Sequence, residues 1–192
     1  MNYATLVSNI ENFTEDNSSE LSASVDQIIA QAETMIFQRL PNLPCFRATA
    51  TGNLVVDTFN YTIASARMIR NVSITSSNVV SYLDHRVDSY LRDYWPNSTT
   101  TGVPIMYSTK SASISGTVIT LAPTPSAILA YAVDYTAPEA GLSSSNTTTW
   151  VGDNAETVLL ASCLYETSAF LKDANTLTLY KQQFDEAIQL FQ

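Results

Sequence analysis

The residues of this sequence that could perform catalysis are few and scattered. His85 is the only histidine, and the two cysteines, Cys45 and Cys163, are far apart in the chain. A base beside Cys163 would allow thiol chemistry, so a small hydrolase that uses Cys163 remains an alternative. The sequence has no Gly-x-Ser-x-Gly motif, no zinc-ligand spacing and no glycine-rich phosphate loop. It therefore predicts no enzyme, with no catalytic, metal or cofactor-binding residue.

Acidic residues recur along one predicted helix. Asp84, Asp88 and Asp93 would offer carboxylates to a metal ion, but Arg86 and Arg92 alternate with them. Asp88 and Arg92 are four residues apart, the spacing of a favourable helical ion pair. The pattern is typical of a charged helix face in solvent.

The charge of the chain is unevenly distributed. The net charge is −9, with −6 in residues 1–38, +3 in residues 39–110 and −6 in residues 111–192. Only 14% of the residues are charged, whereas 22 serines and 23 threonines are present. A surface made polar by hydroxyl groups is typical of proteins that meet other proteins. Acidity that serves only solubility is the alternative.

Arginines are concentrated in the middle of the chain. Arg47, Arg67, Arg70, Arg86 and Arg92 would bind either DNA phosphates or carboxylates, for instance on a neighbouring subunit. Tight DNA binding requires an excess of positive charge, which this chain lacks. We therefore favour the carboxylate role.

Helical periodicity marks both ends of the sequence. Apolar spacing predicts helices at about 3–13 and 25–40, the second with a capping box formed by Ser24 and Gln27. Two further helices are expected at about 154–171 and from Asn175 onward. These four helices are expected to form one bundle.

The middle of the sequence has the alternation of β-strands. Turns are expected at Gly52-Asn53, between strands CFRATAT and LVVDTF, and at Ser115-Gly116. The strand ILAYAVDYT is expected to direct its odd-numbered residues to one face. A helix at about 82–94, capped by Ser81, interrupts the strands and ends before Trp95.

These elements predict an α+β fold: a bundle of N- and C-terminal helices, a central and mostly antiparallel sheet region, and one inserted short helix. We expect a single domain, with a helical layer at about 1–44 and 153–192, a β-rich layer at about 45–137 and an interaction loop at about 138–152. The N-terminus does not resemble a signal peptide, and no apolar run approaches the length of a membrane span.

Several short motifs occur in a fixed order from Gly102 to Asp173. They are Gly102-Val103-Pro104 with Tyr107, Ile119 to Pro125, Tyr135-Thr136-Ala137-Pro138, Leu142-Ser143 with Asn146 and Thr149-Trp150, and Ala169-Phe170-Leu171-Lys172-Asp173. In this order they resemble the head–tail adaptor (connector) proteins of tailed bacteriophages. No single motif is specific, and the resemblance is carried by their succession.

The resemblance implies a structural virion protein, made in the host cytoplasm, that occupies the neck between the portal and the tail. Its partners would be its own copies in a ring, usually a dodecamer, together with the portal protein and a tail or nozzle/neck protein. DNA would pass through without sequence-specific binding, and no membrane is involved. Another neck or tail-completion virion protein is the alternative. The interface candidates are Leu142, Asn146, Trp150, Arg67, Arg70, Arg86, Arg92 and Trp95.

Two expectations depend on this role. The loop with Leu142 and Trp150 is expected to be an interaction element, although Trp150 packing on its own core is equally open. The channel wall is expected to be acidic or neutral and formed by the terminal helices, because fixed like charge keeps DNA from adhering.

Overall fold

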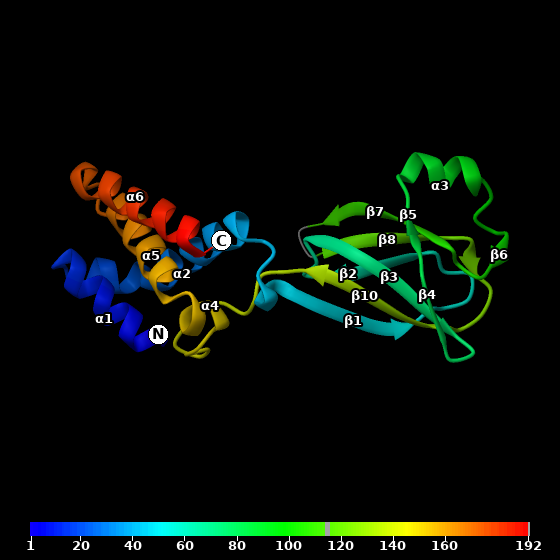
Figure 1. Ribbon diagram of the computed structural model, residues 1–192, viewed down its shortest axis with the longest axis horizontal. Coiled ribbons are helices and arrows are strands. Elements are labelled where there is room, and N and C mark those ends of the chain that lie inside the picture. The colour runs from blue at the N-terminus through cyan, green and yellow to red at the C-terminus, as the bar shows by residue number, and fades with distance from the viewer. Residues whose placement is uncertain (114–115, 192) are drawn as a thin grey trace. The chain divides into compact units, whose positions relative to one another are not determined.

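The structure is a computed structural model that describes residues 1–113 and 116–191. It divides into two compact units (Figure 1). The helical unit comprises Met1–Phe46 and Pro138–Gln192, and the strand unit comprises Arg47–Ala137. The fold is mixed α+β, as predicted. The assignment of both units to a single domain stays a prediction.

The helical unit consists of five α-helices and a short 3-10 helix within the described residues. They are α1 (Tyr3–Thr14), α2 (Ser19–Arg39), η1 (Pro44–Phe46), α4 (Trp150–Asn154), α5 (Glu156–Phe170) and α6 (Ala174–Phe191). The side chain of Asn2 caps α1 by accepting the backbone N–H of Thr5 at 2.9 Å. Asp173 accepts the N–H of Asn175 at 3.0 Å in the first turn of α6. Asn175 itself lies within the helix.

The second helix is longer than its predicted range of 25–40. It begins at Ser19, and the Ser18 hydroxyl caps it by accepting the N–H of Leu21 at 3.2 Å. Ser24 and Gln27 therefore lie inside the helix, and the predicted capping box is wrong. The additional turn places Leu21 fully inside the core, which accounts for the earlier start.

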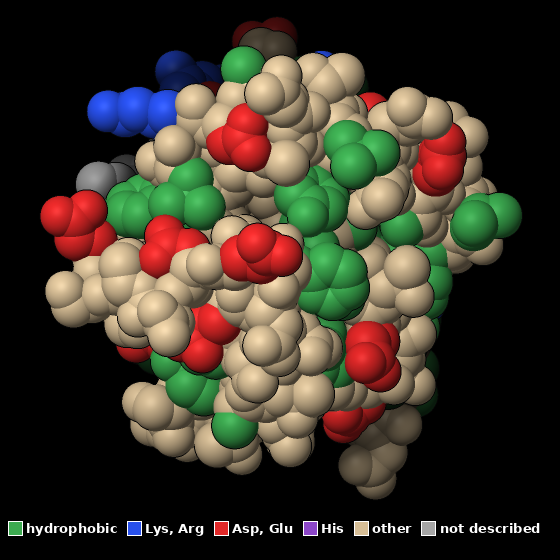
Figure 2. All heavy atoms as spheres, turned by 90° about the vertical axis from the view of Figure 1, so that its left-hand side faces the viewer, with side chains coloured by type: hydrophobic (Ala, Val, Ile, Leu, Met, Phe, Trp, Pro, Cys, Tyr) green, Lys and Arg blue, Asp and Glu red, His purple; other side chains and the backbone are tan. Residues whose placement is uncertain are grey.

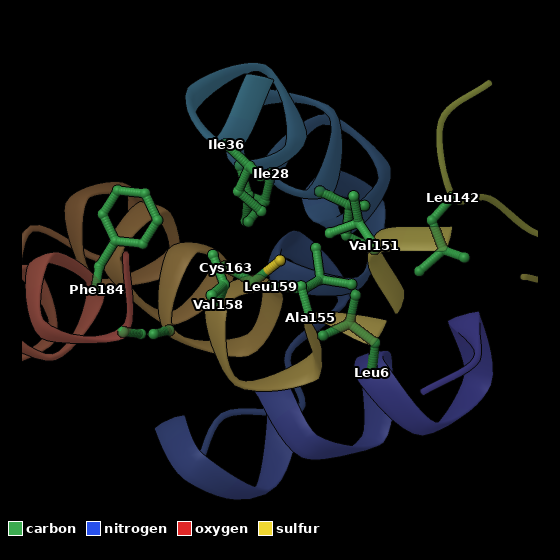
Figure 3. Close-up of a cluster of buried hydrophobic side chains, with 14 of the residues drawn as sticks. Leu6, Ile28, Ile36, Leu142, Val151, Ala155, Val158, Leu159, Cys163 and Phe184 are labelled. Carbon is green, nitrogen blue, oxygen red and sulfur yellow. The ribbon is translucent and has the colours of Figure 1, made fainter. Parts of the chain in front are cut away.

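Helix α5 is the centre of the bundle and contacts α1, α2 and α6. Its Leu159 is fully buried, as are Leu6 of α1 and Ile29 of α2. Figure 3 shows the side chains of this cluster converging from several helices. Each fully buried aliphatic side chain contributes roughly 1.5–3 kcal/mol. The predicted bundle of N- and C-terminal helices is confirmed.

The strand unit contains two four-stranded sheets, in the orders β1-β10-β3-β4 and β2-β8-β7-β5, and a two-stranded ladder β6-β9. All described pairings are antiparallel except β5 with β7 and β6 with β9. The elements are β1 (Arg47–Asn53), β2 (Asn60–Ala64), β3 (Met68–Ser76), β4 (Val79–Tyr82), β5 (Asp84–His85), α3 (Asp88–Tyr94), β6 (Thr101–Gly102), β7 (Met106–Ser113), β8 (Gly116–Ala122), β9 (Thr124–Pro125) and β10 (Ala130–Thr136).

The core of the strand unit follows the predicted alternation of β10. Val133 is fully buried, and Leu129, Tyr131 and Tyr135 pack against the same apolar cluster. Ile74 of β3 and other aliphatic residues from both four-stranded sheets complete this cluster. The packing of the odd-numbered residues of β10 therefore agrees with the sequence pattern. Thr136, from the opposite set, is also buried, beyond a register shift between Asp134 and Tyr135.

The turn predicted at Gly52-Asn53 is wrong. Both residues belong to β1, which pairs with β10 over its whole length. A Cβ atom on Gly52 would lie 2.8 Å from the Oη atom of Tyr131, so the glycine makes room for this ring. The segment Leu54 to Phe59 forms no strand.

The helix predicted at 82–94 is shorter and follows two strands. Only Asp88–Tyr94 is helical, while Ser81 lies in β4 and caps nothing. Ser77 and Asn78 have φ angles of 50° and 63° and join β3 to β4. Two successive left-handed residues form the tight turn of a β-hairpin. The other predicted turn, Ser115-Gly116, lies partly outside the described residues.

Candidate interaction surfaces

Strand β4 presents an apolar surface at a sheet edge. All four of its residues are exposed, with Val79 at 63%, Val80 at 56% and Tyr82 at 71% of full exposure. Large apolar side chains gathered on one strand indicate a contact site. The sequence pattern predicted no strand in this segment, although an asparagine at residue 78 is a residue type that readily adopts the left-handed conformation of a turn.

The backbone of β4 is also available for pairing. The N–H of Leu83 donates to the Val72 carbonyl at 2.8 Å, which fixes the alternation of the antiparallel ladder. The N–H and C=O groups of Val80 and Tyr82 consequently point away from β3. Free backbone groups on an apolar edge can accept another extended strand.

No charged residue or proline protects this edge. Residues 71–83 contain neither Asp, Glu, Lys, Arg nor Pro. Native proteins usually protect exposed edges with such residues to prevent unwanted pairing. Their absence is typical of an edge that a partner covers in the assembled state.

Three arginines cluster at one end of the sheet that contains β1, β10 and β3. Arg47 is paired in register with Thr136, and the Arg70 Nε atom donates to Thr136 Oγ1 at 3.0 Å. The backbone N–H of Arg67 donates to the Thr136 carbonyl at 2.8 Å. All three side chains are exposed. We call this group the arginine cluster.

A groove of about 470 Å³ borders the arginine cluster. Arg47, Arg70, Asn71 and Asp134 contribute to its lining. Asp134 Oδ1 accepts the hydroxyl of Thr49 at 2.5 Å. The groove therefore combines two guanidinium groups with one carboxylate.

The other two predicted arginines do not join this cluster. Arg92 pairs with Asp88 at 2.6 Å, as its helical spacing predicts, and Arg86 pairs with Asp84 at 3.3 Å. Lys110 also contacts Asp88, at 2.9 Å. The hydrogen bond from Lys110 and, to a smaller extent, the Arg92 guanidinium lower the pKa of the Asp88 carboxyl. These side chains already have carboxylate partners in their own chain.

Trp95 follows α3 and lines a pocket of about 250 Å³ together with Leu91, Arg92 and Lys110. Its indole nitrogen is buried, and among the described residues no hydrogen-bond acceptor reaches it. An unsatisfied buried donor costs roughly 1–3 kcal/mol. Trp95 is half-buried and packs against Leu91, Met106 and Ala122 of the strand unit.

Two carboxylates hold the loop between β10 and α4. Glu33 of α2 accepts the N–H of Leu142 through Oε1 at 3.0 Å and Oε2 at 3.2 Å. Glu139 accepts the N–H groups of Trp150 and Val151 at 3.1 and 3.2 Å. Burial and the nearby Glu139 carboxylate raise the pKa of Glu33 to about 7, against the lowering effect of the Leu142 N–H.

The predicted loop residues have different environments. Leu142 is buried in the core of the helical unit. The Asn146 side-chain amide donates to the carbonyls of Ala140 and Gly141 at 2.9 and 3.0 Å. Trp150 begins α4, packs against the same core and meets Phe191 edge-on at 6.5 Å. The loop ends at Thr149, and its contribution to an interface stays a prediction.

The two units differ strongly in charge. The helical unit contains thirteen acidic and three basic residues, a net charge of −10, whereas the strand unit contains five acidic and six basic residues, a net charge of +1. Figure 2 shows acidic side chains spread over the face that it presents, with apolar side chains between them. The acidity of the chain thus belongs to its helical unit.

The residues considered for catalysis are divided between the two units. Cys163 is fully buried and burial raises the pKa of its thiol, which opposes formation of a reactive thiolate. Burial also raises the pKa of Cys45 to about 11. His85 belongs to the strand unit, where its ring lies 5.0 Å from that of Tyr107. Within residues 1–113 and 116–191, no three His, Cys, Asp or Glu side chains form a metal-binding group.

The chain matches the SU10 adaptor protein family over residues 1–192. It belongs to this family. Membership confirms the resemblance to phage head–tail adaptors and identifies a bacteriophage adaptor, a structural component of the virion that interacts with other head and tail proteins. The family points to a structural rather than an enzymatic role.

The search of curated proteins gave no match to this chain. In the described part of this adaptor, no helix has both the length and the apolar character needed to cross a membrane.

Proposed function

We propose that this adaptor forms a homo-oligomeric ring, a dodecamer, between the portal and the tail, and that DNA passes through it without sequence-specific binding. The protein is made in the host cytoplasm and becomes part of the virion neck. Family membership supports the general role. The observation that carries the assembly is the exposed, uncharged edge strand β4.

The exposed surface of the strand unit also supports protein contacts. Besides β4, it exposes Val87 at 65% and Ile128 at 71% of full exposure, and Tyr90 and Tyr94 at 46%. Aromatic and aliphatic side chains of this kind are common anchors of interfaces. Repetition of one interface around a ring makes individually weak contacts strong in sum.

The charge distribution supports passage of DNA. A helical unit with a net charge of −10 repels phosphates if it lines the channel. The Debye length of roughly 8 Å at physiological salt confines this repulsion to the region close to the wall. We therefore place the helical unit at the channel and expect weak or no binding of duplex DNA to the ring.

Imaging of the purified adaptor, alone and mixed with the portal of its phage, tests this proposal. We expect closed rings of uniform symmetry, at least in the presence of the portal, which serves as a template. If neither sample contains rings, the proposal is wrong. Rings that bind the tail tube but not the portal would instead identify a tail-completion protein.

Substitution Trp150→Ala tests the role of the loop. Loss of ring assembly with an unchanged melting temperature would support an interface. A lowered melting temperature with intact assembly would assign Trp150 to the core of the helical unit, against which it packs.

A further inference from the structure

We propose that the arginine cluster binds the acidic corner between α1 and α2 of a second copy of this chain. The inference rests on the proposed self-assembly and specifies the surfaces that meet. Arg47, Arg67 and Arg70 form one half of the contact. The other half is the acidic corner, defined by Glu11, Glu15, Asp16 and Glu20.

Among the described residues, no salt bridge reaches the carboxylates of the acidic corner. Four carboxylates lie within ten residues, and residues 1–38 contain no lysine or arginine. Phe13, in the middle of this segment, has 56% of its surface exposed. The corner therefore offers negative charge around an apolar side chain, which is the chemistry that arginines recognise.

The corner is also positioned for an external contact. Helix α2 has 21 residues, so the corner lies about 31 Å along the helix from Arg39. The corner therefore lies at the opposite end of α2 from Arg39, within the helical unit.

The arginine cluster is complementary in sign. Its three guanidinium groups and the single carboxylate of Asp134 give this end of the sheet a net charge of about +2. Arg47 and Arg70 also have partners within their own chain, whereas Arg67 is exposed and its backbone alone is bonded to Thr136. Arg67 is therefore the residue best placed to reach another molecule.

The arginine cluster could face protein carboxylates or DNA phosphates. Asp134 lies in the groove beside the arginines and repels both kinds of anion, so it does not distinguish them. The net charge of −9 opposes approach to the continuous negative charge of DNA, whereas the negative charge of a second copy belongs to its helical unit and leaves the strand unit at +1. Every copy carries both the cluster and the corner, so each molecule can bind one neighbour and be bound by another. Such a head-to-tail contact generates a closed ring when the rotation between successive copies closes, and an open filament when it does not.

The contact also reduces the electrostatic repulsion between copies that assemble side by side. Copies with helical units of −10 repel each other when they are brought side by side. Placing each acidic corner against the arginines of the next copy offsets part of this repulsion. The contact should weaken as salt is raised, because exposed ion pairs are screened.

Isotope-resolved crosslinking tests the inference without requiring rings. Arg67→Lys supplies an amine at the cluster, which a zero-length carbodiimide joins to any carboxylate in direct contact. An equal mixture of light and heavy-nitrogen protein, with and without the portal, distinguishes links between copies from links within one copy. We expect links between copies from position 67 to Glu11, Glu15, Asp16 or Glu20. Links only within one copy, or none to the corner, would overturn the inference.

Charge reversal gives a second measurement. We expect Arg67→Glu and Glu15→Arg each to weaken self-association at least tenfold in sedimentation, and the double variant to recover most of it. Lys181→Glu, an exposed control with the same charge change in the helical unit, should have a smaller effect. If Arg67→Glu leaves association intact but abolishes binding of duplex DNA, the cluster serves phosphates and the inference is wrong. Crosslinked pairs without rings would instead refute only the proposed ring.

Discussion

Glu33 allows a quantitative test of how the helical unit is held together. Its half-buried carboxylate accepts the N–H of Leu142, a residue 109 positions away, and lies in the field of Glu139. The pKa of Glu33 is about 7 in the folded protein, against an ordinary value of 4.5. The charged form is therefore disfavoured by folding. The stability that this group contributes is complete below pH 4.5 and is lost as the pH rises towards 7.

The magnitude follows from this difference in pKa. At 1.36 kcal/mol per pH unit, it corresponds to about 3.4 kcal/mol. Solvent screening of a half-buried side chain reduces this to about 1–2 kcal/mol. Glu33→Gln keeps an oxygen that can accept the Leu142 N–H but has no charge. We therefore expect the free energy of unfolding of Glu33→Gln, relative to the natural chain, to rise by about 1–2 kcal/mol between pH 4.5 and pH 8.

Urea denaturation followed by circular dichroism at 222 nm is the appropriate assay, because the long helices all belong to the helical unit. Glu33→Gln and the natural chain are compared at each pH. The contributions of all other carboxyl groups to the free energy of unfolding then cancel. Gln38→Asn is an uncharged substitution on the same helix and serves as the control. Its free energy of unfolding should differ from that of the natural chain by the same amount at both pH values. A pH-independent difference between Glu33→Gln and the natural chain would refute the reasoning.

Three further substitutions test the other parts of the structure. Leu159→Ala, in the fully buried centre of the bundle, should lower the free energy of unfolding by about 3–5 kcal/mol in the same assay; a loss below about 1 kcal/mol would contradict this packing. The double variant Ser77→Asn, Asn78→Gly should stabilise the β3–β4 hairpin by about 0.5–1 kcal/mol, because glycine adopts the left-handed conformation without strain. Hydrogen exchange of the backbone amides of β3 and β4 should then become slower. Val80→Lys should change stability by less than about 0.5 kcal/mol yet reduce ring assembly in sedimentation; unchanged assembly would remove β4 from the interface.

The sequence was sufficient to predict the elements whose periodicity is long and uninterrupted. The four main helices and the strand that contains Val133 fall close to their expected positions. The start of α2 was missed because Ser18 and Ser24 are equivalent as local caps, and only the burial of Leu21 distinguishes them. The helix predicted at 82–94 was too long because helical spacing alone does not show that a β-hairpin precedes it.

The candidate surfaces were less predictable, because they depend on contacts between distant segments. Arg47 and Arg70 line the same groove only because β10 lies between β1 and β3, and no local pattern encodes that order. The same limitation applies to Glu33 and Leu142, which are in contact although 109 positions separate them in the sequence. By contrast, the pairing of Asp88 with Arg92 was predicted correctly, since both residues lie on one helix four positions apart.

The distribution of charge indicates why one chain needs two such different units. An uncharged edge such as β4 favours pairing by backbone groups and apolar side chains, and this pairing is little affected by salt. A unit with a net charge of −10 instead resists close contact with other acidic surfaces and with DNA. In the proposed ring, the strand unit would then supply most of the adhesive surface, while the helical unit keeps the passage free. The arginine cluster is the exception that allows an acidic corner to approach, and this would direct repulsive units into one defined arrangement.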